Sequence, residues 1–286
     1  MNQTQEKNSK NVYDIKTILI YLTAFAIPVI LTLAVMIRKG ITPFGDKSLF
    51  IWDAEYQYKD YFGYLWDILH GNASIEFSAG KSLGGKMTGL FGYYLSSPLN
   101  ILLFFFQKSQ IAQFMSFMTV LRIGLCGLTS QFFFRKRFSI SVVSSLLLST
   151  AYALMEYNIY YCRNIMWMDG VVMLPLVAYG VYSHVHTGKK NILWISTAVA
   201  IIANWYTGYM ICFMSGICFI YEYYLWNGNS IFRNIKKGLR TAVRYIAVLL
   251  GGVLTSMAVL LPACMALVGG KATNSTSFGI SGKVNY

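Results

Sequence analysis

The chain has 286 residues, of which 56% are hydrophobic, 16% are aromatic and only 12% are charged. A soluble domain carries roughly twice that share of charged residues. The apolar residues fall in continuous runs of bilayer-spanning length, not in the alternation of a β-barrel, so the sequence predicts an all-α polytopic membrane protein. The net charge of +13 does not indicate nucleic acid as a partner, because Lys and Arg gather in the cytoplasmic loops of membrane proteins.

Apolar runs predict about seven transmembrane helices. The first run is too long for the core of a signal peptide and lacks a small-residue cleavage site, so we expect a retained span after a cytoplasmic tail at 1–16. No linker or repeat divides the chain, which predicts a single domain over 1–286. The runs cover roughly 17–37, 110–134, 139–155, 169–187, 191–204, 208–226 and 241–262.

The distribution of charge predicts an orientation for these spans. With the N-terminus inside, the inner segments hold thirteen basic and three acidic residues, whereas the outer segments hold ten basic and eight acidic residues. This asymmetry is typical of a multi-pass protein of the bacterial cytoplasmic membrane, with an extracellular loop at 38–109 and an extracellular tail at 268–286. The inner basic residues are Lys7, Lys10, Lys16, Arg135, Lys136, Arg137, Lys189, Lys190, Arg233, Lys236, Lys237, Arg240 and Arg244.

The loop at 38–109 is long for a helix connection, and its many aromatic residues argue against disorder. Helical spacing within 51–70 separates a polar face from an apolar face, which predicts an amphipathic helix with its apolar face in the lipid headgroups. A simpler alternative is an interfacial helix whose acids are only solvated. The polar face holds Asp53, Tyr56, Gln57, Asp60, Tyr64 and Asp67; the apolar face holds Tyr58, Tyr61, Phe62, Leu65 and Leu69.

A glycine-rich stretch, SAGKSLGGKMTG (78–89), follows in the same loop. Its GxxxxGK pattern matches the beginning of a phosphate-binding loop, but Met87 stands where that motif requires Ser or Thr. We therefore reject a nucleotide site. Lys81 and Lys86 stay candidates for contact with a phosphate group.

Two further features concern depth in the membrane. Residues 90–106 are apolar enough to enter it, but Gly92 and Pro98 predict a broken re-entrant or interfacial segment, not a span. Arg122 lies within a predicted span, where a charge is costly and marks either a functional site or a buried pair. A structural partner within the bundle and a ligand both stay open for it.

Polar residues also gather between the third and fourth predicted spans, in the segment 155–176. We expect them to form a polar pocket at the outer leaflet, in the same compartment as the loop. Two plainer explanations stay open: Asp169 can cap the helix that follows it, and Arg163 can pair with Glu156. The pocket candidates are Arg163, Asn164, Trp167 and Asp169, with Asn204, Trp205 and Tyr206 from the next outer connection.

Four stretches of the chain carry a resemblance to a known family. They are WDAEYQY (52–58), GKSLGGK (80–86), YYLSSPLNIL (93–102) and RNIMWMDGVVMLPL (163–176). Together they resemble the YfhO family of bacterial membrane proteins, which is similar in design to the GT-C glycosyltransferases. The resemblance spans nearly the whole chain and implies a GT-C-like transmembrane fold. Members of that family are usually far longer, so we expect this chain to be truncated relative to them.

The resemblance implies a membrane glycosyltransferase that moves a sugar from a polyprenyl-phosphate carrier to a cell-envelope polymer such as teichoic acid. GT-C enzymes carry an acid in the first outer loop, and Asp53 matches that position, which implies a general base. The resemblance implies that the remaining site residues bind substrate. For Glu55, Asp60 and Asp169 it also implies that they assist the base or hold a metal. These substrate-binding residues are Glu55, Gln57, Tyr58, Asp60, Lys81, Lys86, Arg163, Asn164, Trp167 and Asp169.

Cofactors and partners are less defined by the residues. No cofactor is indicated, and a divalent metal stays open. The expected partners are the lipid-linked sugar, the envelope polymer and membrane lipids. Two alternatives to the enzyme are a transporter or flippase for a lipid-linked precursor and a non-catalytic scaffold for envelope assembly.

Overall fold

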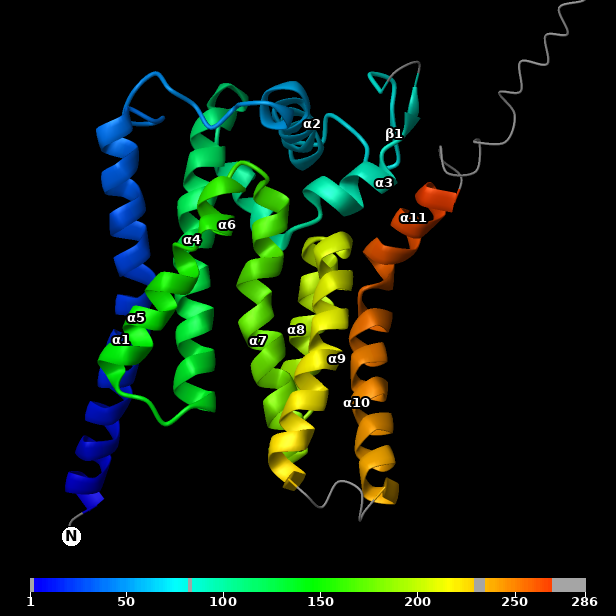
Figure 1. Ribbon diagram of the computed structural model, residues 1–286. Helices are drawn as coiled ribbons and strands as arrows, with labels where there is room; N and C mark the ends of the chain where they lie inside the picture. Colours follow the sequence, from blue (N-terminus) through cyan, green and yellow to red (C-terminus); the bar gives the residue numbers. More distant parts are fainter. Residues whose placement is uncertain (1–2, 82–83, 229–234, 269–286) are drawn as a thin grey trace, which may run out of the picture.

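The computed structural model describes residues 3–81, 84–228 and 235–268, and it is mainly a bundle of helices (Figure 1). This confirms the all-α class that the composition predicts. The helices are α1 (Gln3–Lys39), α2 (Lys59–Leu69), α3 (Thr88–Leu90), α4 (Ile111–Arg137), α5 (Val142–Ala153), α6 (Glu156–Tyr160), α7 (Ile165–Thr187), α8 (Asn191–Ala203), α9 (Trp205–Asn227), α10 (Ile235–Thr255) and α11 (Met257–Val268). Shorter elements are η1 (Ala54–Tyr58), η2 (Phe91–Leu95), η3 (Pro98–Phe105), η4 (Lys108–Gln110) and a hairpin of β1 (Phe77–Ser78) and β2 (Gly85–Lys86).

Helix length limits how many of these elements cross a bilayer unaided. Among the described residues, four helical segments are long and apolar enough: Ile15–Lys39, Lys108–Arg137, Ile165–Thr187 and Lys236–Thr255. Helices α5 and α8 are shorter than the roughly 20 residues that a span requires. Every expected span contains helix, but a count of seven spans is not established.

The last expected span, 241–262, is divided in two. Helix α10 ends at Thr255, and α11 begins at Met257 and turns aside (Figure 1). Between them Ser256 is buried, and its hydroxyl donates to the carbonyl of Val253. Such back-bonding by Ser competes with the helical hydrogen bonds and often bends helices, a feature that apolar periodicity alone does not reveal.

The connections alternate between the two ends of the bundle as the predicted topology requires. The loop after α1 and the α8–α9 turn lie at one end, which we call the loop end (Figure 1). The α4–α5 and α7–α8 connections lie at the opposite end. Which end faces the cytoplasm stays a prediction from charge. Most of the predicted outer tail, 269–286, lies outside the described residues.

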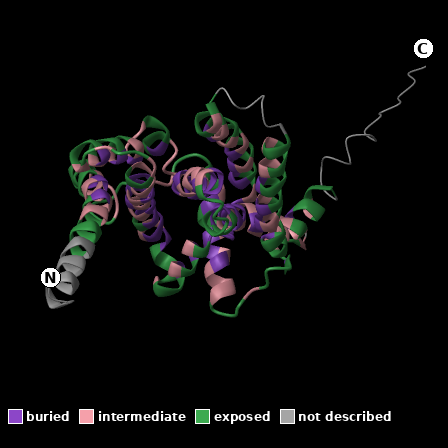
Figure 2. Ribbon diagram, turned by 90° about the horizontal axis from the view of Figure 1, so that it is seen from below, coloured by how far each residue is buried: buried purple, intermediate pink, exposed green. Residues whose placement is uncertain are grey.

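Helix α7 lies at the centre of the bundle and packs against α4, α8 and α9. In the apolar windows of α4 and α7, 61% of the residues are buried, against 11% in α1 and 17% in α10. Viewed along the bundle, buried residues face neighbouring helices and exposed residues face outward (Figure 2). The exposed apolar faces of α1 and α10 therefore suit contact with lipid.

Close packing of α1 on α4 depends on small residues. A Cβ at Gly127 would collide with the carbonyl oxygen of Ala24, so only glycine permits this approach.

The cysteines form no disulfide bonds, since all five are free. Cys126 is buried, and Cys264 is exposed.

The helix predicted at 51–70 exists as η1 followed directly by α2. Its apolar face packs on protein instead of lipid headgroups, which corrects the interfacial prediction. Tyr58, Phe62 and Leu65 are buried in one core cluster with Leu103 of η3. The rings of Phe62 and Phe114 of α4 lie 5.5 Å apart. An apolar stripe identifies a buried face, but it does not say whether lipid or protein covers that face.

The segment 90–106 forms η2 and η3 and contains no helix long enough to span a membrane, as predicted. The break falls at Ser96 and Ser97, directly before Pro98. Gly92 is not a break: it lies within η2, where an added Cβ would sit 3.1 Å from the Cβ of Ala263 on α11. Its small size instead allows α11 to approach the loop.

Candidate functional site

Asp53 lies where the loop turns into the helix η1–α2. The residue before it, Trp52, has a φ of 57°, an uncommon conformation for a bulky residue. Asp53 occupies the N-cap position of η1, but its side chain accepts no capping hydrogen bond. The side chain is exposed, so its carboxylate is open to solvent at the surface of the loop end.

Four tyrosines form a cluster beside Asp53. The ring of Tyr94 lies 5.5 Å from that of Tyr58, 4.8 Å from that of Tyr61 and 4.5 Å from that of Tyr93. Burial, the neighbouring tyrosines and the charge of Asp53 raise the pKa of Tyr94 to about 12. Burial and Asp53 also raise the pKa of Tyr58. Both phenols therefore keep their protons at neutral pH and stay available as hydrogen-bond donors.

Residues just before and at the beginning of α7 contact this cluster or the neighbouring Trp52. The guanidinium carbon of Arg163 lies 5.0 Å from the ring centroids of both Trp52 and Tyr160. The Tyr58 hydroxyl donates a long, 3.5 Å hydrogen bond to Oδ1 of Asn164. Trp167 Nε1 donates to the hydroxyl of Tyr93 at 3.2 Å. A cation on an aromatic face is attracted by about 0.5–2 kcal/mol, so the Arg163 stack helps to hold the two segments together.

Asp169 does not share this exposed site, although the sequence places it there. It is buried and forms a bidentate ion pair with Arg122, at 2.8 Å to Nε and 2.9 Å to Nη2. Nη2 also donates to Ser97 and Asn100, at 3.3 Å each. The capping explanation is wrong, because α7 begins at Ile165 with Asn164 as its N-cap. Of the two alternatives for Arg122, a structural partner or a ligand, the structure shows a structural partner.

Arg163 has an aromatic environment in place of the acidic partner considered for it. In the described part of the chain, no ion pair joins Arg163 to Glu156. The other predicted polar residues of the loop helix vary in exposure: Glu55 and Asp60 are exposed, and Gln57 is half-buried. By helical spacing, Gln57 and Asp60 face the same side as Asp53, whereas Glu55 points to another side.

The lysines of the glycine-rich stretch lie on the hairpin, next to α11. Lys81 Nζ donates to the backbone carbonyl of Lys86 at 2.6 Å. Both line a cavity of about 840 Å³ with Glu76 and apolar residues of α11 such as Met265. The Tyr64 hydroxyl donates to the carbonyl of Phe77 at 3.1 Å and so fixes the hairpin to α2. This basic cavity is distinct from the Asp53 cluster.

Tyr93 and Tyr94 are central to the site, but the sequence did not suggest them as site residues, because their segment indicated only depth in the membrane and a family resemblance. The available signal was two adjacent tyrosines in an otherwise apolar run. The outer connection before α9 also reaches the cluster, as proposed for it. Asn204 Nδ2 donates to the Tyr93 carbonyl at 2.6 Å, and the rings of Trp205 and Tyr206 each lie 5.9 Å from that of Tyr93.

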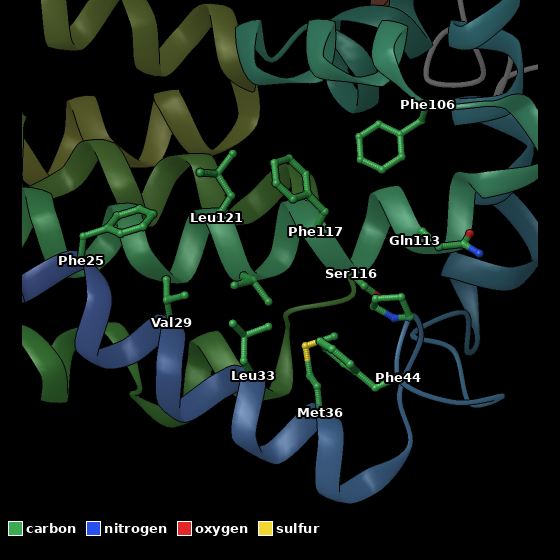
Figure 3. A pocket seen from close by; sticks show the side chains of 12 residues that line it. Phe25, Val29, Leu33, Met36, Phe44, Phe106, Gln113, Ser116, Phe117 and Leu121 are labelled. Carbon is green, nitrogen blue, oxygen red and sulfur yellow. The ribbon is translucent and has the colours of Figure 1, made fainter. Parts of the chain in front are cut away.

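A second, apolar cavity lies between α1 and α4 near the loop (Figure 3). It measures about 470 Å³ and is lined by side chains such as Val29, Met36 and Leu121, with Phe44 and Phe106 from the loop. Its polar lining includes Gln113, whose buried Oε1 has no hydrogen-bond partner in the described structure. No group of three His, Cys, Asp or Glu residues that could hold a metal ion is present within residues 3–81, 84–228 and 235–268.

The fold and this site define an all-helical membrane protein whose loop end carries an exposed acid beside an aromatic cluster. The family model described as bacterial membrane protein YfhO matches residues 24–286. The chain belongs to the YfhO family of bacterial membrane proteins, which confirms the resemblance seen in the sequence. Neither the curated proteins nor the solved structures contain a match to this chain.

Proposed function

We propose that this protein is a glycosyltransferase of the cytoplasmic membrane that takes a sugar from a polyprenyl-phosphate carrier and transfers it to a cell-envelope polymer such as teichoic acid. The observation that carries the proposal is the exposed carboxylate of Asp53 beside the tyrosine cluster, with Arg163 on the ring of the preceding residue, Trp52. An acid, a cation and aromatic platforms meet here from segments more than one hundred residues apart. The charge asymmetry supports an extracellular position for this end of the molecule.

The chemistry assigns one task to each group. The acceptor hydroxyl attacks the anomeric carbon of the sugar, and Asp53 takes the proton of that hydroxyl as the new C–O bond forms. The bond between the sugar and the carrier phosphate breaks, and its electron pair leaves with the phosphate. Arg163 would neutralise the developing negative charge.

Two cavities support a carrier that is anchored in the membrane. The apolar cavity between α1 and α4 suits part of an isoprenoid chain, because its lining is almost wholly hydrocarbon. The hairpin cavity combines Lys81 and Lys86 with the apolar surface of α11. Positive charge beside apolar surface suits the phosphate group of a lipid. Either cavity can hold a carrier while its sugar reaches the loop end.

The test is glycosylation of the envelope polymer in a deletion strain complemented with wild type or Asp53→Asn. The amide cannot accept the proton, so we expect transfer to fall by about 10²–10⁴-fold while the protein still inserts. Asp46→Asn is the matched control, because Asp46 is an exposed acid of the same loop that lies outside the cluster. Wild-type transfer by Asp53→Asn would rule the proposal out.

The transporter alternative draws its support from the intramembrane Arg122. That side chain is completely buried and bound to Asp169, which leaves no exposed surface for a transported ligand. Loss of uptake of a lipid-linked precursor in Arg122→Gln, together with normal uptake in Asp53→Asn, would favour a transporter.

A further inference from the structure

A polar cavity lies at the end of the bundle opposite the loop. It measures about 360 Å³ and lies where the end of α7, the beginning of α8 and the first turns of α10 meet. None of its lining residues is acidic, and two are basic. The lining residues are His184, Val185, Gly188, Lys190, Thr241 and Arg244.

The positive charge of this cavity is not neutralised from nearby. Lys190 and Arg244 are exposed, and neither forms any of the ion pairs of the described residues. Glu222 of α9 also lies at this end, but its carboxylate binds Arg137 at 2.7 Å and His186 at 3.1 Å. The cavity therefore keeps a local excess of two cations.

A buried polar atom faces the same cavity without a protein partner. His184 is only 3% exposed, and its Nδ1 has no hydrogen-bond partner within the described structure. Backbone carbonyl groups of Lys189 and Thr241 lie near the ring, but neither satisfies Nδ1. An unpaired buried nitrogen costs about 1–3 kcal/mol, so in the tautomer that carries its hydrogen on Nδ1, a ligand that accepts that hydrogen bond would remove the penalty.

The backbone around this cavity is a third feature that favours an anion. Gly188 adopts the left-handed conformation, with a φ of 72°, and ends α7 so that the chain reverses within a few residues. Helix α8 then begins at Asn191, and its N-cap residue, Lys190, provides no capping side chain. The first amides of a 13-residue helix therefore begin beside the two cations, and such amides favour anions.

We propose that this cavity binds a phosphate-bearing anion. Lys190 and Arg244 would supply charge, the first amides of α8 and His184 Nδ1–H would donate hydrogen bonds, and Thr241 would supply a hydroxyl. Such a phosphate can come from the headgroup of an anionic phospholipid in the adjacent leaflet or from a soluble phosphate compound. The site is independent of the proposed transferase activity, because it lies at the other end of the bundle.

The experiment measures the thermal unfolding midpoint of the purified full chain with two probes. In detergent, inorganic phosphate replaces chloride at constant ionic strength. In vesicles, phosphatidylcholine alone is compared with phosphatidylcholine containing phosphatidylglycerol. The test variant is Lys190→Gln with Arg244→Gln. The control is Lys136→Gln with Lys236→Gln, which removes the same charge from exposed residues at the same end but outside the cavity.

We expect the midpoint of wild type and control to rise with at least one probe, and the apparent affinity of the test variant to be at least about tenfold weaker. A response to phosphate assigns a soluble ligand, and a response only to phosphatidylglycerol assigns a lipid. His184→Phe should weaken the same response. The proposal is overturned if neither probe stabilises wild type, or if test and control variants lose the response equally.

Discussion

Two carboxylates, those of Asp53 and Asp169, show how the surface of the loop end differs from the core of the bundle. Asp53 is exposed beside a cluster of tyrosine rings, with no hydrogen bond that caps its helix. Asp169 is 4% exposed and gives both oxygens to Arg122. The sequence suggests one shared compartment for both acids, yet their surroundings are opposite. An acid held by a buried cation maintains the fold, whereas an acid without such a partner keeps its oxygens available for a substrate.

The largest expected effect is on the buried pair. Asp169→Asn leaves the Arg122 guanidinium buried without its counter-charge, so we expect a loss of roughly 3–5 kcal/mol in the free energy of unfolding. Denaturant unfolding of the purified protein in detergent measures it. The double change Arg122→Leu with Asp169→Leu removes both charges and should restore much of the stability. A single change that costs less than 1 kcal/mol would show that the pair is not structural.

The next effect concerns the contact between Arg163 and the two rings. Arg163→Gln removes a cation that lies 5.0 Å from the centroids of Trp52 and Tyr160, so we expect a loss of about 1 kcal/mol in unfolding free energy. Arg163→Lys keeps the charge but not the planar group, and should recover only part of that loss. Full recovery by lysine would mean that charge alone matters at this position.

A smaller effect is expected at the exposed ion pair between Lys108 and Asp67. The two groups are 2.6 Å apart, but 51% of the Lys108 side chain is exposed. Lys108→Gln should therefore cost about 0–1 kcal/mol, and the difference from wild type should shrink as salt is added. Unfolding at low and high salt measures this. A loss that salt does not change would indicate an uncharged contribution, such as packing of the lysine stem.

The smallest effect on stability is expected for Asp53→Asn. The side chain is exposed and receives no capping hydrogen bond, so the free energy of unfolding should change by no more than about 0.5 kcal/mol. Paired with the transfer assay, this result sharpens the contrast with Asp169. If Asp53→Asn destabilises the protein as much as Asp169→Asn does, a loss of transfer would report on folding and not on catalysis.

The sequence predicted much of the architecture but less of the site. Continuous apolar runs predicted the helices, and the spacing of Tyr58, Phe62 and Leu65 predicted the buried face of the loop helix. The convergence of the loop with Arg163, Asn164 and Trp167 was also predicted, because a regular alternation of spans puts both segments at one end. Whether protein or lipid covers an apolar face was not predictable, since both offer the same hydrocarbon surface.

Composition, periodicity and charge order by themselves determined the membrane class, the helical fold and the alternation of the connections. These properties depend on local spacing, which a single chain displays directly. Only the tertiary structure paired Arg122 with Asp169, joined Tyr93 to Trp167, divided the last span at Ser256 and formed the basic cavity around His184. Each of these depends on distances between segments far apart in the chain, and packing sets those distances.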